Sequence, residues 1–228
     1  MDTVRQLLLA GIGAGLLAGL VVSIVQFGTT TPLILVAETY ETPGAGHAPD
    51  RQPTSVPEAD PARIAGTILA NLVTGAGFGL LLVAAFAVRG EAPGPTRGLA
   101  WGAAGFVAVA LAPALGLPPE LPGSRTAALE ARQLWWLGTV LATAGALWLV
   151  AFGGRYRLLG LLALPIPHLI GAPRPEIVGG SSPPELAAHF AAASLVVGAV
   201  FWATLGVSAG WLFTRVSGVG YQLGHEVR

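Results

Sequence analysis

The chain has 228 residues, of which 53% are hydrophobic and only 11% are charged, against roughly 25% charged residues in an ordinary soluble domain. Its formal net charge is zero, and no basic stripe marks a nucleic-acid-binding surface. It has no cysteines, which excludes disulfides and thiolate metal sites and leaves nitrogen and oxygen as the available metal ligands. The composition indicates an integral membrane protein.

The first predicted helix lies near the N-terminus. Arg5 is followed by an uncharged run from Gln6 to Ala37, far longer than the roughly 7–15-residue core of a cleavable signal. We therefore expect a retained helix within Leu7 to Ala37. At about 1.5 Å per residue this helix exceeds the bilayer core, so it must tilt, kink near Pro32 or project from the membrane.

A proline-rich segment, Thr42 to Ala62, follows this helix. Its five prolines and polar residues predict a flexible external loop rather than a folded domain. Asp60 and Pro61 form a cap and first-turn pair that is suited to opening the next helix.

The remaining hydrophobic runs predict an all-α fold, a polytopic membrane helix bundle in a single membrane domain over residues 1–228. A spanning helix needs about 20 mostly apolar residues. Leu158 to Ile170 is short for a span and contains Pro165 and Pro167, so it is either a thin, kinked helix or a re-entrant element. Six transmembrane helices are favoured, with five plus one short or re-entrant helix as the alternative. The other four spans run about Ile64 to Val88, Gly98 to Leu117, Gln133 to Gly154 and Leu186 to Thr214.

The arginines predict the orientation, because basic residues gather in cytoplasmic loops near the ends of spans. With six crossings and a cytoplasmic N-terminus, seven of the twelve arginines lie inside and nine of the twelve acids lie outside. We therefore expect a protein of the cell inner membrane with both termini in the cytoplasm. The inside arginines are Arg5, Arg89, Arg97, Arg155, Arg157, Arg215 and Arg228.

Glycines recur at four-residue spacing in the predicted helices, a pattern that lets helix backbones approach closely within a membrane. The buried amides Gln26 and Asn71 are expected to hold helices together rather than to bind substrate. The glycine series are Gly11, Gly15 and Gly19, then Gly75 and Gly79, Gly98 and Gly102, and Gly206 and Gly210.

The polar residues near the predicted outer helix ends are the candidate metal ligands. Carboxylate and imidazole groups together suit borderline divalent ions such as Co, Ni or Zn. If the outer helix ends converge, these side chains form one site, with the two histidines sharing a cavity with at least one glutamate. The predicted ligands are Glu38, Glu120, Glu130, His168 and His189.

Several of these residues also have a purely structural interpretation. Glu185 lies three positions after Ser182, as in a capping box, and His189 lies four positions further on, on the same helical face. The imidazole of His168 is placed to donate to a carbonyl that Pro165 or Pro167 leaves without a helical donor. Glu130 with Arg132 is interpretable as an interfacial charge pair.

Two proline-rich segments, residues 113–123 and 167–180, have similar sequences. Their alignment places Glu120 beside Glu176 and Gly123 beside Gly179. An internal repeat of a helical hairpin and chance similarity in a chain rich in Ala, Gly, Leu and Pro both remain open.

The chain resembles the CbtA family, the proposed cobalt transporter subunits of bacteria. The resemblance covers most of the chain in order, and the strings PPELPG, ARQLWW and PHLIGAP are its most unusual parts. The matching segments are LLLAGIGAGLLAGLVVSIVQ (7–26), PLILVAETYE (32–41), LAPALGLPPELPG (111–123), ARQLWWLGT (131–139), PHLIGAP (167–173) and ELAAHFAAASL (185–195).

The resemblance implies a B12-linked permease subunit that takes up divalent cobalt and works with a small single-span partner of the CbtB type. It implies Co²⁺ as the transported ion, with no tightly bound cofactor. CbtA-like chains often carry a histidine-rich first outer loop, whereas this chain has only His47 there.

The phosphate-binding loop of ATPases and the HExxH motif of metalloproteases are absent from the sequence, so we do not expect an enzyme. The alternative to a permease is a non-transporting membrane protein whose groove holds a lipid, a cobamide precursor or a partner helix. An oligomer is compatible with either function.

Overall fold

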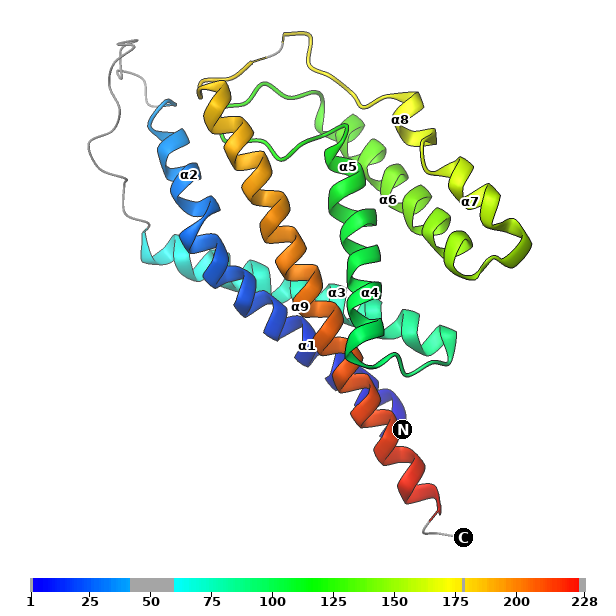
Figure 1. The fold of residues 1–228 in the computed structure, drawn as a ribbon. Coiled ribbons are helices and arrows are strands. Elements are labelled where there is room, and N and C mark those ends of the chain that lie inside the picture. The colour runs from blue at the N-terminus through cyan, green and yellow to red at the C-terminus, as the bar shows by residue number, and fades with distance from the viewer. Residues whose placement is uncertain (1, 42–59, 178, 226–228) are drawn as a thin grey trace. The chain divides into compact units, whose positions relative to one another are not determined.

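The structure is a computed structural model that describes residues 2–41, 60–177 and 179–225 (Figure 1). Helices form most of the described chain, and the pairing between its extended segments is limited to one isolated bridge, Ser124 with Gly180. Most of the proline-rich loop predicted at 42–62, including His47, lies outside the described residues. The prediction of an all-α fold is confirmed for the part of the chain that the structure describes.

The chain divides into two compact units. Unit 1 comprises Met1–Gln26, Asp60–Ala103 and Val197–Arg228, and unit 2 comprises Phe27–Ala59 and Ala104–Val196. The expectation of a single membrane domain remains a prediction.

The first helical segment is broken close to Pro32, which is one of the three alternatives expected from its length. Helix α1 runs Asp2–Gly28 and helix α2 runs Thr30–Glu38, with Thr29 between them in a non-helical conformation. Pro32 lacks a backbone N–H, and its ring clashes with the carbonyl of the residue four positions earlier in a continuous helix. That residue is Gly28, where α1 ends.

Unit 1 contains a close crossing of α1 with α3, Pro61–Arg89. Asp60 caps α3 by accepting from the N–H of Ala62 at 3.2 Å, with Pro61 in the first turn, as expected. A Cβ atom on Gly15 or on Gly75 would overlap the carbonyl oxygen of the other residue. The glycine spacing therefore permits contact between the two helix backbones.

The amides predicted to join helices do so at the end of the same crossing. The side-chain N–H₂ of Asn71 on α3 donates to Gln26 Oε1 at 2.7 Å and to Ser23 Oγ at 3.0 Å on α1. Ser23 Oγ in turn donates to the carbonyl of Gly19 at 2.8 Å. These polar groups satisfy one another inside the unit.

A second glycine crossing in unit 1 joins α4, Gly94–Phe106, to α9, Pro184–His225. A Cβ atom on Gly98 would overlap the carbonyl oxygen of Gly206, and one on Gly210 would overlap that of Gly94. Phe86 is 1% exposed and packs edge-on against Trp101 and Phe213, with ring centroids 5.5 Å apart in both pairs.

In unit 2 the helix begun by α4 continues through a π-helical turn, η1 Val107–Leu111, into α5, Ala112–Ala114. Pro113 removes the N–H that would bond to the carbonyl of Val109, and the wider π turn accommodates this loss. Helix α6, Leu129–Phe152, follows after a loop.

The short segment predicted at Leu158 to Ile170 is two helices. A 3₁₀ turn, η2 Gly154–Tyr156, leads into α7, Arg157–Ala163, and α8 runs Ile166–Ile170. Both helices pack against α6, and Figure 1 shows α7 running beside it. Pro165 and Pro167 account for the break, so the prediction of a bent element here is confirmed.

Five helices of the described chain are long and apolar enough to cross a membrane, so the multi-pass membrane protein predicted from composition is supported. The count of six transmembrane helices is not confirmed, because α7 and α8 are each too short for this criterion. The five candidate spans are Val4–Gly28, Pro61–Arg89, Gly94–Ala114, Leu129–Phe152 and Pro184–Val216.

Candidate functional site

Unit 2 brings the end of α2 against the start of α9. Ala37 of α2 and Phe190 of α9 are 0% and 9% exposed, and they form a buried cluster with Leu121 of the loop after α5. Glu38 directly follows Ala37, and His189 directly precedes Phe190. We call this region the α2–α9 junction; apolar residues that complete it are Leu33, Ile34, Leu186 and Ala187.

Two loops pair beside this junction. Ser181 N–H donates to Gly123 O at 3.2 Å, and Arg125 N–H donates to Gly179 O at 2.9 Å. Gly123 has φ +76° and Gly179 has φ +137°, backbone conformations that favour glycine. The C-terminal ends of the two segments with similar sequences therefore lie next to each other. A Cβ on Gly123 would approach Glu41 Oε1 at 2.8 Å, which places that carboxylate at the same loops.

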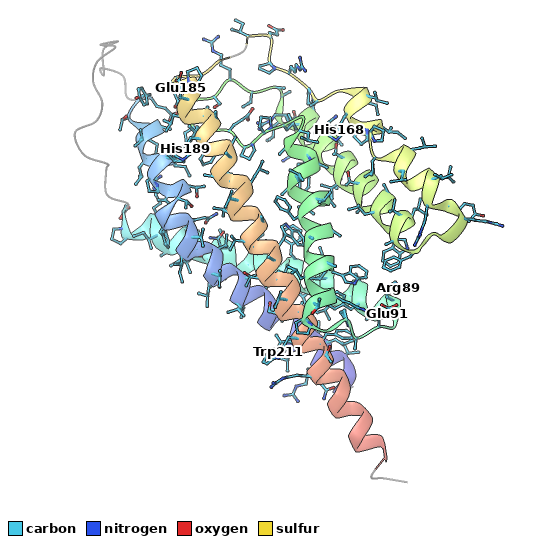
Figure 2. The ribbon with its side chains drawn as sticks, viewed as in Figure 1. Arg89, Glu91, His168, Glu185, His189 and Trp211 are labelled. Carbon is cyan, nitrogen blue, oxygen red and sulfur yellow. The ribbon has the colours of Figure 1, made fainter. Side chains whose placement is uncertain are left out.

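His189 is exposed on the first turns of α9, as is Glu185, and Figure 2 shows both at this end of the helix. The capping box predicted from Ser182 and Glu185 is wrong in its first residue, because Ser182 does not cap the helix. The helix begins at Pro184, and the carbonyl of Pro183 accepts the first helical N–H groups, while Ser182 Oγ is buried without a hydrogen-bond partner in the described chain.

Glu120 pairs with Arg132, across the loop between α5 and α6. Arg132 Nη2 lies 2.6 Å from Glu120 Oε2, and each side chain is 27% exposed. The interfacial pair predicted between Glu130 and Arg132 is replaced by this pair, and Glu130 is exposed in the first turn of α6. The carboxylate of Glu120 is thus already neutralised by a guanidinium.

His168 lies at α8, against the start of α6. Its imidazole contacts the indole of Trp135 edge-on, with ring centroids 5.8 Å apart. Trp135 Nε1 donates to the carbonyl of Pro167 at 3.2 Å. The carbonyl of Pro167 also accepts from the N–H of Gly171 at 3.1 Å, so it keeps its helical donor. The carbonyls that lose a donor to Pro165 and Pro167 are those of Leu161 and Ala163. A bond from the His168 imidazole to one of them remains a prediction.

The structure does not gather the five predicted ligands into one group. Within residues 2–41, 60–177 and 179–225, no set of three or more His, Asp and Glu side chains is placed to hold a metal ion. Figure 2 shows His168 on α8 and His189 on α9, apart from each other. The five-residue site remains a prediction, and two of its members, Glu38 and His189, flank the α2–α9 junction.

Sequence reasoning missed two features near Glu120. One is its pairing with Arg132, which lies 12 positions away, beyond the reach of helical periodicity. The other is the π turn η1, for which Pro113 was the available signal. Together they border a cavity of about 390 Å³ between α5, α6 and α9.

Comparison with known proteins places the chain. The family model described as "Probable cobalt transporter subunit (CbtA)" matches residues 4–214. The chain belongs to the CbtA family. The match includes all five candidate spans except the last residues of α9. No match was found among curated proteins or among solved structures. Membership of the CbtA family confirms the resemblance read from the sequence. The function that the match supports is that of a cobalt transporter subunit.

Proposed function

We propose that this chain is the membrane-embedded subunit of a divalent cobalt uptake permease of the cell inner membrane. One observation carries the proposal, the CbtA family match over residues 4–214 of a chain with five membrane-length apolar helices. The ion is the cargo, held briefly and released, rather than a resident cofactor. The proposal is tested by Co²⁺ flux into proteoliposomes that contain the purified chain, with and without a small single-span partner.

Capture of Co²⁺ is proposed at the α2–α9 junction, with Glu38 and His189 as the first ligands. Packing of Ala37, Leu121 and Phe190 holds the two helices together, and this supports a short distance between their sequence neighbours Glu38 and His189. Carboxylate oxygen and imidazole nitrogen suit a borderline divalent ion. A transported ion must bind weakly enough to leave again, so two protein ligands with retained waters fit transport better than a closed cage.

Glu120, Glu130 and His168 stay proposed ligands for later stages of the path. To bind the metal, Glu120 would have to break its ion pair with Arg132. His168 lies against the ring of Trp135. Because the chain has no ATPase motif, transport by this subunit requires the membrane potential or a partner. A small CbtB-like subunit is the partner that the proposal includes.

The orientation proposed from the arginines has the loops after α5 and α8 outside and both termini in the cytoplasm. Pairing of Gly123 with Ser181 supports the same side for these two loops. Since α6 is long enough to span, the chain that follows Phe152 must return across the same thickness to bring Gly179 back to Arg125. This supports a sixth crossing made by the broken pair α7 and α8.

The orientation gives a direct labelling prediction, because the natural chain has no cysteines. Glu176→Cys is expected to react with a membrane-impermeant maleimide in intact cells, whereas Arg155→Cys is expected to react only after the membrane is opened. Both positions are exposed in the structure. Labelling of both from outside would contradict the sixth crossing, and the reverse pattern would invert the orientation.

A further inference from the structure

A cavity in unit 2 has a charged end and an apolar end. Its volume is about 390 Å³, within the roughly 300–1,000 Å³ range of small-molecule sites. The charged end is formed by Glu120 and Arg132, with the amide of Gln133 beside them. We call it the Glu120–Arg132 cavity; its apolar walls include Pro113, Leu117 and Leu195.

The position of the two ends follows the helices that form them. Glu120 lies in the loop beyond α5, and Arg132 and Gln133 lie in the first turns of α6. Val109 and Leu195, which lie deeper along their helices, line the other end. In a chain whose helices span a bilayer, this arrangement puts the charges near an interface and the apolar walls toward the hydrocarbon.

The charged end carries one fixed positive and one fixed negative group, 2.6 Å apart. A simple anion would meet the carboxylate of Glu120, and a simple cation would meet the guanidinium of Arg132. A ligand that presents a phosphate next to a primary ammonium complements both charges at once.

Arg132 also retains unused donor capacity. Its Nη2 bonds to Glu120, while its Nε is buried without a hydrogen-bond partner in the part of the chain that the structure describes. A buried donor without an acceptor is uncommon in folded proteins. A modest rotation of the guanidinium toward a phosphate oxygen would supply the missing acceptor, and arginine is well suited to bind phosphate.

We propose that the Glu120–Arg132 cavity binds a zwitterionic phospholipid whose headgroup carries a primary ammonium. The phosphate lies against Arg132 and the ammonium against Glu120, while an acyl chain follows the wall of Pro113, Leu117 and Leu195. Apolar walls favour a lipid over a free phosphoester, because a soluble headgroup would leave them in water. This lipid site does not depend on cobalt transport.

Native mass spectrometry of the purified full chain tests the site. The detergent-solubilised protein is titrated with phosphatidylethanolamine and, separately, with phosphatidylglycerol of identical acyl chains. The wild type is expected to bind phosphatidylethanolamine roughly tenfold more tightly, because only this headgroup satisfies both charges. Arg132→Gln is expected to lose about that factor, whereas Arg125→Gln, which removes an exposed arginine outside this cavity, keeps the wild-type affinity.

A second variant covers the case in which Arg132→Gln does not fold. Leu195→Trp fills the apolar end, keeps both charges and is likewise expected to weaken phosphatidylethanolamine binding. Equal affinity for the two lipids in the wild type would overturn the proposal. Wild-type phosphatidylethanolamine affinity in the folded Arg132→Gln or Leu195→Trp protein would also overturn it.

Discussion

Gly75→Val is expected to lower the thermal stability and the yield of folded protein strongly. Its side chain would collide with the carbonyl of Gly15, because the α1 and α3 backbones are in direct contact there. The neighbouring atoms belong to backbone in both helices, so no side chain can rotate away. Overpacking costs about 1–3 kcal/mol of folding free energy even where side chains adjust. The contact at Gly75 is with rigid backbone, so we expect the cost of this substitution to lie at or above that range. A loss of this size is a large part of a typical folding free energy of roughly 5–15 kcal/mol.

The matched control is Gly77→Val, two residues further along the same helix. Gly77 is exposed, and an added Cβ would have no atom within 4 Å. Its apparent melting temperature should change little, since surface substitutions usually alter stability by less than about 0.5 kcal/mol. Both variants are compared by size-exclusion chromatography after heating in detergent. A Gly75→Val protein as monodisperse and heat-resistant as Gly77→Val would refute the backbone contact.

His189→Ala is expected to weaken Co²⁺ uptake by roughly 10- to 100-fold in half-saturating concentration. The estimate follows from losing a ligand bond worth about 1.5–3 kcal/mol, as for a hydrogen bond to a charged group. Glu38→Gln is expected to produce a similar loss, because it removes the carboxylate from the other side of the α2–α9 junction. If both residues bind one ion, the double variant should be little worse than either single variant.

The control for this series is Glu176→Gln, which removes an exposed carboxylate on the same proposed side of the membrane. Its uptake should equal that of the wild type, and all variants should elute as folded protein. His168→Ala completes the set, since His168 is a proposed ligand elsewhere in unit 2. Wild-type uptake by the folded His189→Ala and Glu38→Gln proteins would remove the capture pair. Loss only in His168→Ala would move capture to α8.

Local chemistry in the sequence predicted the helices and their contacts. Asp60 and Pro61 fixed the start of α3, and Pro32 marked the break between α1 and α2. The four-residue glycine spacing predicted close crossings, because this spacing places small residues on one helical face. The identity of the crossing partners, α1 with α3 and α4 with α9, required the structure.

The candidate site was less predictable, because it depends on where the loops between helices place their residues. Glu120 meets Arg132 only because the loop after α5 folds back to the first turn of α6, whereas sequence distance favoured Glu130. His168 lies before the connection between α8 and α9, and His189 lies after it. Figure 2 nevertheless shows the two residues apart. Proximity to one connection did not bring the two rings together.

Because the carboxylate of Glu120 pairs with Arg132, we propose the α2–α9 junction as the main point of Co²⁺ capture. Glu38 and His189 flank this junction, and the carboxylate of Glu41 lies near its paired loops. This division assigns lipid binding and ion capture to different parts of unit 2, so the variants at Arg132 and His189 should affect different ligands.

Co²⁺ flux into proteoliposomes is the measurement that tests the cobalt permease most directly. Liposomes carrying the purified chain, alone and together with a small single-span CbtB-like subunit, receive external Co²⁺ under an inside-negative potential, and an enclosed metal-sensitive dye reports arrival. We predict that the flux exceeds that of protein-free liposomes in at least one of the two preparations. We also predict that His189→Ala reduces this flux. Flux equal to protein-free liposomes in both preparations, with folded protein inserted in the membrane, would contradict transport by this subunit.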